Sequence, residues 1–125
     1  MDSIRDIHRI VAYAVPSGFA LLALWALYSL IRNKDPHPWF WTLLGILQAV
    51  IGVQFIVGGA LFLAGNRTDS WRHYFYGAFF PAIVLIVAHR WARGATTGPW
   101  LVFGVAGLVC FGLTLMALFT GLGII

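Results

Sequence analysis

Residues 7–31 read IHRIVAYAVPSGFALLALWALYSLI. The stretch is mostly apolar and its one arginine lies near its start. As an α-helix it would extend roughly 35 Å at about 1.5 Å per residue. Because the hydrocarbon core of a membrane is about 30 Å thick, this length predicts a transmembrane helix. Pro16 lies inside the stretch and predicts a bend, since it removes one backbone hydrogen bond.

Three further apolar stretches predict helices at about residues 39–64, 71–91 and 99–122. None shows the period-2 alternation of a membrane-spanning strand. Lipid offers the backbone no hydrogen-bond partner, so each segment must satisfy its own polar groups as a helix. Short loops join the helices, which predicts antiparallel neighbours. The expected fold is an all-α, up-down-up-down, integral membrane four-helix bundle that forms a single domain over residues 1–125.

The composition excludes several classes of function. Only 10% of the residues are charged and 61% are hydrophobic, whereas a soluble domain has about 25% charged residues. No acid or lysine lies inside an apolar stretch, so proton-coupled transport has no evident carrier. The net charge of +4 is spread along the loops, which indicates contact with the membrane surface and not with a nucleic acid. The expected partners are the lipid bilayer and either further copies of the chain or a larger membrane complex.

An internal repeat places a histidine at a helix start, a small residue four positions on and a proline eight positions on. The two copies are His8, Ala12 and Pro16, then His73, Gly77 and Pro81. A Pro-Trp pair begins the apolar stretch after each copy. The pattern predicts a pseudo-twofold repeat of a two-helix hairpin, with one imidazole at the same depth in each copy.

The paired histidines predict a metal site. Neutral imidazole is a common ligand of haem iron, so His8 and His73 are the expected metal ligands if their helices lie diagonally in the bundle. Ala12 and Gly77, one turn along the same helix faces, would leave space for a flat cofactor. The alternative is that both histidines are interfacial residues whose polar tips lie among the lipid headgroups.

Other polar residues have candidate roles as well. Arg9 and Arg72 flank the two histidines and could bind haem propionates. Gln48 and Gln54 are polar within the second apolar stretch; hydrogen bonding between helices is favoured for them, and contact with a quinone or porphyrin is the alternative. The remaining histidines, expected on the opposite side of the membrane and in contact with solvent, are His37 and His89.

These motifs are similar to one half of the haem A synthase family. The resemblance covers roughly residues 6–88 and rests on His8-Arg9 at a helix start, Gln48-x-x-x-Gly52 in the next helix, and His73 at the start of the third. It implies a four-helix half-bundle in which the two histidines occupy axial-ligand positions. The family's acidic residue directly before His-Arg is replaced here by an apolar one, with Asp6 the only nearby acid, and the second half is missing. The family's oxidase activity is therefore not carried over.

The sequence favours a membrane module that binds haem b and takes part in electron transfer or haem handling. The alternative is a non-catalytic accessory subunit of a larger respiratory or photosynthetic complex, with chlorophyll, quinone or lipid contacts in place of haem. No set of residues typical of an enzyme stands out. We expect a prokaryotic inner membrane location, with loops 32–38 and 92–98 facing the cytoplasm.

Overall fold

The computed structural model describes residues 2–67, 71–96 and 98–124. Within these residues, four helices are long and apolar enough to cross a membrane. The helical elements are α1 (Asp2–Arg32), α2 (Trp39–Leu63), a third helix built from α3 (Trp71–Tyr74), η1 (Phe75–Phe79) and α4 (Phe80–Gly94), and α5 (Pro99–Gly121). The predicted all-α four-helix fold is confirmed.

Two helix boundaries differ from the prediction by more than one residue. Helix α1 begins at Asp2, five residues before the expected start, and the third helix continues to Gly94 instead of ending at residue 91. No glycine or proline lies between Asp2 and His8 to stop the first helix. Beyond residue 91, the third helix meets no glycine until Gly94, where it ends. The apolar pattern marks the part of a helix that lipid covers, whereas the polar turns beyond it remain helical.

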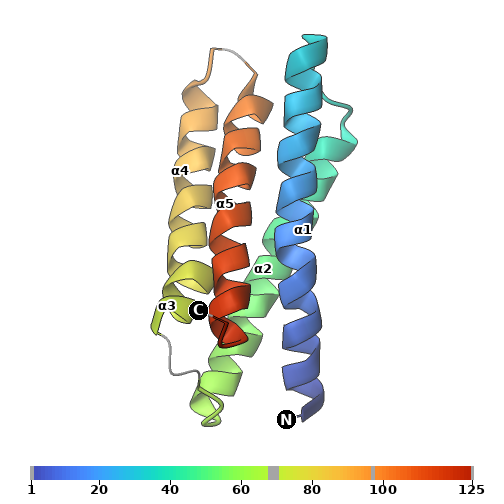
Figure 1. The fold of residues 1–125 in the computed structure, drawn as a ribbon. Coiled ribbons are helices and arrows are strands. Elements are labelled where there is room, and N and C mark those ends of the chain that lie inside the picture. Colours follow the sequence, from blue (N-terminus) through green and yellow to red (C-terminus); the bar gives the residue numbers. More distant parts are fainter. Residues whose placement is uncertain (1, 68–70, 97, 125) are drawn as a thin grey trace.

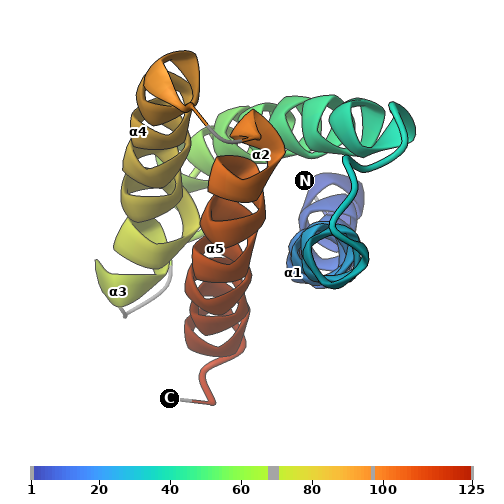
Figure 2. The ribbon, with the colours of Figure 1, turned by 90° about the horizontal axis from the view of Figure 1, so that it is seen from above.

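Helix α5 is the central element of the bundle. It packs along α1 on one side and along α3, η1 and α4 on the other, while α2 packs mainly against α1. Figure 2 shows α5 between α4 and α1, with α2 crossing at an inclination to α1. Neighbouring helices along the chain run in opposite directions, and the N-terminus, the turn after α2 and the C-terminus lie toward one end (Figure 1). The first and third helices are therefore separated across the bundle.

The contact between α1 and α5 is unusually close because glycines face it. A Cβ atom at Gly104 would collide with Cβ of Ala26, and one at Gly107 would lie 3.2 Å from Cδ2 of Leu22. Leu22 is fully buried at this contact. Small residues allow helix backbones to approach closely in lipid, where dispersion contacts replace the hydrophobic effect as the source of association.

The two copies of the internal repeat differ in backbone geometry. Helix α1 continues through Pro16, and the Ser17 hydroxyl donates to the carbonyl of Tyr13 at 2.9 Å. The second copy contains the π-helical turn η1, which includes Gly77 and ends two residues before Pro81. A π-turn accommodates one extra residue, so the two copies have the same sequence spacing but different backbone geometry.

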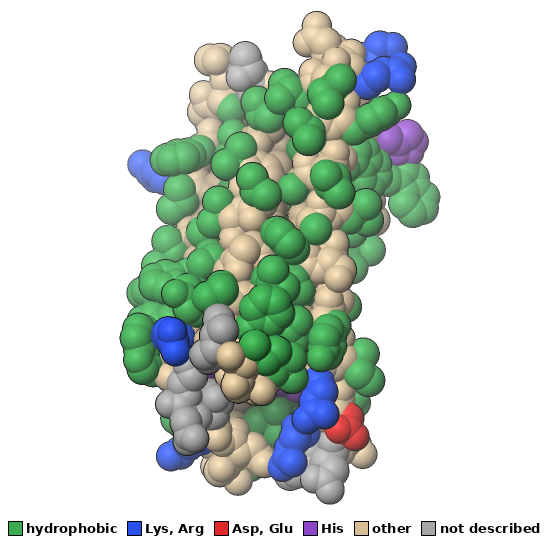
Figure 3. All heavy atoms as spheres, viewed as in Figure 1, with side chains coloured by type: hydrophobic (Ala, Val, Ile, Leu, Met, Phe, Trp, Pro, Cys, Tyr) green, Lys and Arg blue, Asp and Glu red, His purple; other side chains and the backbone are tan. Residues whose placement is uncertain are grey.

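Hydrophobic side chains cover the outer surface over the middle of the bundle, and basic side chains gather toward both ends (Figure 3). Large side chains such as Ile31, Ile56 and Leu63 are more than 70% exposed. An exposed apolar surface of this extent is expected when lipid and not water surrounds a protein. The chain thus has the length, polarity and surface of a membrane protein.

The α1–α5 contact predicts how the bundle responds to a single methyl group. We expect Gly104→Ala to destabilise the fold by about 1–3 kcal/mol, because the helices must separate to admit the added atom. Gly112→Ala on the same helix is the control, since a Cβ there has no atom within 4 Å. Thermal unfolding in detergent measures both variants. Equal stability of the two would contradict the close packing of α1 on α5.

Candidate functional site

A large cavity lies between the helices at the end of the bundle where α1 begins. Its volume is about 1260 Å³, somewhat larger than the roughly 300–1,000 Å³ that is usual for a small-molecule site. Helices α1, α2 and α5 and the α3–η1 segment all contribute to its wall. Most of the wall is apolar, with residues such as Ile51, Phe55 and Leu118, and both His8 and His73 line it.

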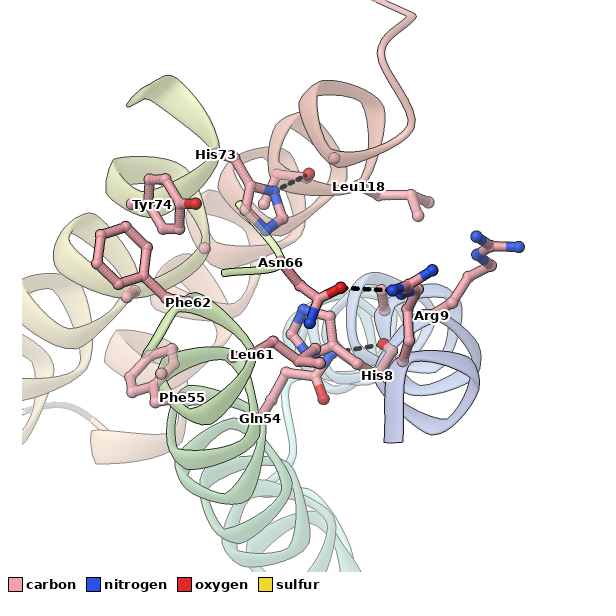
Figure 4. A pocket seen from close by; sticks show the side chains of 18 of the residues that line it. His8, Arg9, Gln54, Phe55, Leu61, Phe62, Asn66, His73, Tyr74 and Leu118 are labelled. Carbon is pink, nitrogen blue, oxygen red and sulfur yellow. Dashed lines mark hydrogen bonds between the residues drawn. The ribbon is translucent and has the colours of Figure 1, made fainter. Parts of the chain in front are cut away.

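His8 and His73 face each other across this cavity from different helices (Figure 4). Their ring centroids are 6.3 Å apart and their planes meet at 72°. An imidazole nitrogen binds a first-row metal such as zinc at about 2.0 Å and lies roughly 1.1 Å from its own ring centre, so two imidazoles on opposite sides of one metal ion would have centroids roughly 6.2 Å apart. The separation of the two rings therefore fits a single metal ion between them.

One nitrogen of His73 is already engaged. Nδ1 lies 2.8 Å from the carbonyl oxygen of Ala117 on α5, so this nitrogen carries the proton and donates. Nε2 then has its lone pair free. A backbone carbonyl in this position is the usual second-shell partner of a metal-binding histidine, because it fixes the tautomer and the ring orientation.

The His8 ring is held differently. Within the described residues, its Nδ1 is buried and has no hydrogen-bond partner. The Gln54 side chain reaches from α2 and donates through Nε2 to the backbone carbonyl of His8 at 2.7 Å. This bond connects α2 to α1 at the level of the cavity.

Arginines form one rim of the cavity. Arg5, Arg9 and Arg67 line it, and no acidic side chain does so among the described residues. Arg5 donates to Oδ1 of Asn66, which joins the start of α1 to the turn after α2. Such a rim suits the carboxylates of an amphipathic ligand. Arg9 lies where the sequence analysis expected it, whereas Arg5 and Arg67 were missed because nothing in their local sequence reveals that the two segments meet.

Arg72 does not take the expected position. It is exposed at the start of α3 and does not line the cavity. Arg67, in the turn before α3, occupies the rim instead; its Nε donates to the carbonyl of Phe62 and its guanidinium lies 4.2 Å from the centre of that ring. The two arginines are five residues apart, so the sequence alone could not decide between them.

Gln48, which was also a candidate cofactor contact, lies outside the cavity. Its Oε1 accepts a hydrogen bond from Nε2 of His89 on α4, at 2.6 Å. Both glutamines thus form the interhelical bonds that were the favoured interpretation. His89 was expected to contact only solvent, but it bonds to Gln48 and packs edge-on against Phe103 with centroids 4.8 Å apart.

The two small residues of the repeat do line the cavity. Ala12 lies one turn from His8 on α1. A Cβ at Gly77 would lie 3.4 Å from Cβ of Ala117, so Gly77 also allows η1 to approach α5.

Away from the cavity, the exposed His37 accepts a hydrogen bond at Nδ1 from the Trp39 backbone N–H, 3.1 Å away.

No protein family model, curated protein or solved structure matches this chain. Among the described residues, no group of three or more histidine, cysteine, aspartate or glutamate side chains could hold a metal ion. A site with two imidazoles can still bind a metal whose other ligands come from a macrocycle, as in haem. The candidate site therefore rests on the two histidines and the cavity around them.

The position of Gln48 yields a second prediction. Gln48→Leu should destabilise the fold by about 0.6–2 kcal/mol, because it leaves Nε2 of His89 without its partner between α2 and α4. The variant should leave the cavity at the other end of the bundle unchanged. Unfolding in detergent measures the first effect, and ligand binding by the folded protein measures the second. A change in ligand binding without loss of stability would contradict this prediction and show that Gln48 takes part in ligand binding.

Proposed function

We propose that this chain is a membrane module that binds haem b, with His8 and His73 as the two axial ligands of one iron. The observation that carries the proposal is the 6.3 Å separation of the two ring centroids within a cavity large enough for a porphyrin.

The residues around the pair have roles that suit this ligand. The carbonyl of Ala117 holds the Nδ1 proton of His73 and so directs the Nε2 lone pair to the metal. Apolar side chains such as Phe55 and Leu118 line the cavity and would exclude water from a bound haem. Arg5, Arg9 and Arg67 would meet the propionates at the rim.

When bound, haem b supplies a one-electron redox couple. The chain's own contribution would be two imidazole ligands, from His8 on α1 and His73 on α3, that would hold the iron from two helices. This arrangement favours electron transfer or cofactor holding over catalysis, and we assign no catalytic residue. Chlorophyll or a quinone remains an alternative occupant of the same cavity, and an accessory role within a larger membrane complex is the alternative function.

We place the protein in the inner membrane of a prokaryote, with the loops around residues 32–38 and 92–98 in the cytoplasm. Each end carries four basic residues, and those at this end are Arg32, Lys34, Arg90 and Arg93. The other end also holds three of the four acids, so the net positive charge is greater at the end that we propose to be cytoplasmic. The haem cavity would then open toward the opposite side of the membrane. A redox partner would approach the cavity from that side. The partner would be a further copy of the chain or another subunit of a membrane complex.

The proposal predicts an absorption spectrum. Protein purified in detergent from haem-replete cells should show a Soret band, and narrow α and β bands on reduction, as expected for six-coordinate low-spin iron. His8→Ala and His73→Ala should each lose the six-coordinate spectrum, because each removes one axial ligand. His37→Ala and His89→Ala serve as controls and should retain it, since both residues lie outside the cavity.

A folded, colourless wild-type protein would overturn the haem proposal. If that protein also co-purified with a large complex, the accessory-subunit alternative would take its place. Retention of the full spectrum in both His8→Ala and His73→Ala would show that the iron is bound elsewhere.

A further inference from the structure

We infer that Gly58 and Gly121 are positioning residues, each forming the surface on which one histidine ring of the site rests. The inference builds on the proposed function, because it concerns how that site sets the orientation of its two ligands. Neither glycine stands out in a sequence whose second and fourth helices are rich in glycine.

The contacts at the two glycines are alike. A Cβ atom at Gly58 would lie 3.2 Å from Cε1 and 3.9 Å from Nε2 of His8. A Cβ atom at Gly121 would lie 2.9 Å from Cε1, 3.0 Å from Nδ1 and 3.8 Å from Nε2 of His73. In each case Cε1 is the ring atom closest to the glycine, whereas the nearer ring nitrogen is Nε2 at Gly58 and Nδ1 at Gly121.

The two contacts follow the hairpin repeat. His8 on α1 rests on Gly58 of α2, and His73 on α3 rests on Gly121 at the end of α5. Each hairpin thus supplies the ligand from its first helix and the supporting glycine from its second. The correspondence was hidden in the sequence, because the histidine and its glycine are about 50 residues apart and meet only when the hairpin closes.

The glycines matter because few other contacts fix the rings. Nδ1 of His8 has no hydrogen-bond partner among the described residues, and Gly58 lies against Cε1 of the same ring. His73 has the bond to Ala117, and a methyl group at Gly121 would push against the atom that makes it. A displaced ring changes both the direction of its lone pair and the 72° angle between the planes.

The angle between axial imidazole planes has a direct spectroscopic signature. In low-spin ferric haem, nearly perpendicular planes give a strongly anisotropic electron paramagnetic resonance signal, and parallel planes give a rhombic one. The wild-type protein should therefore show the anisotropic signal. Gly121→Ala should shift its largest g value and lower haem affinity by about 10- to 100-fold, the usual effect of disturbing a second-shell contact. Gly58→Ala should give a smaller change of the same kind, because its contact is less tight.

Matched controls come from the same two helices. Gly45→Ala on α2 and Gly112→Ala on α5 add the same methyl group where no atom lies within 4 Å and outside the cavity. Both should retain the wild-type signal and affinity. If all four variants bind haem and show the wild-type signal, the inference is wrong while the proposed function stands.

A measurement on the ligand-free protein separates the inference from the proposed function. Side-chain ¹H–¹⁵N resonances report the Nδ1 proton that His73 donates to Ala117. Gly121→Ala should lose or shift this resonance, and Gly112→Ala should keep it. If wild-type protein binds no haem, the proposed function fails, and this comparison still decides whether Gly121 positions the ring: an unchanged resonance in Gly121→Ala would overturn the inference.

Discussion

The close packing of α5 is the constraint on which the site depends. Lipid provides no hydrophobic driving force between helices, so they associate through small residues that bring their backbones together. Gly104 and Gly107 allow α5 to lie directly against α1, and the other flank of α5 packs along α3, η1 and α4. The first and third helices never pack closely, and α5 sets the distance between them. That distance decides whether the two imidazoles can share one ligand.

The polar groups of the cavity have separate tasks. Gln54 ties α2 to the His8 backbone, and the carbonyl of Ala117 orients the His73 ring. Arg5 and Asn66 connect the start of α1 to the turn after α2 at the rim. At the other end of the bundle, Gln48 and His89 connect α2 to α4. Unpaired polar groups are costly inside a membrane, and these bonds reduce that cost. The bond to Ala117 engages Nδ1 of His73 and leaves the lone pair of Nε2 free.

The helices and the histidine pair could be predicted from the sequence, because apolar length and the helix-start positions of His8 and His73 are local signals. The placement of other residues could not. Gln48 and Gln54 are six residues apart, about 240° around a helix, so they face different partners. The sequence shows that both are polar residues in one apolar stretch but not which residues they contact. Arg67 and Gly121 depend on which distant segments meet, and the π-turn at Gly77 alters a spacing that looks exact in the sequence.

The central claim is that one iron lies between His8 and His73, and near-infrared magnetic circular dichroism of the oxidised protein tests it most directly. The charge-transfer band of low-spin ferric haem reports the chemical nature of both axial ligands. The account predicts the band position of bis-imidazole coordination in wild-type protein and its loss in either histidine variant. A band typical of any other ligand pair, or a high-spin spectrum in the wild type, would contradict it.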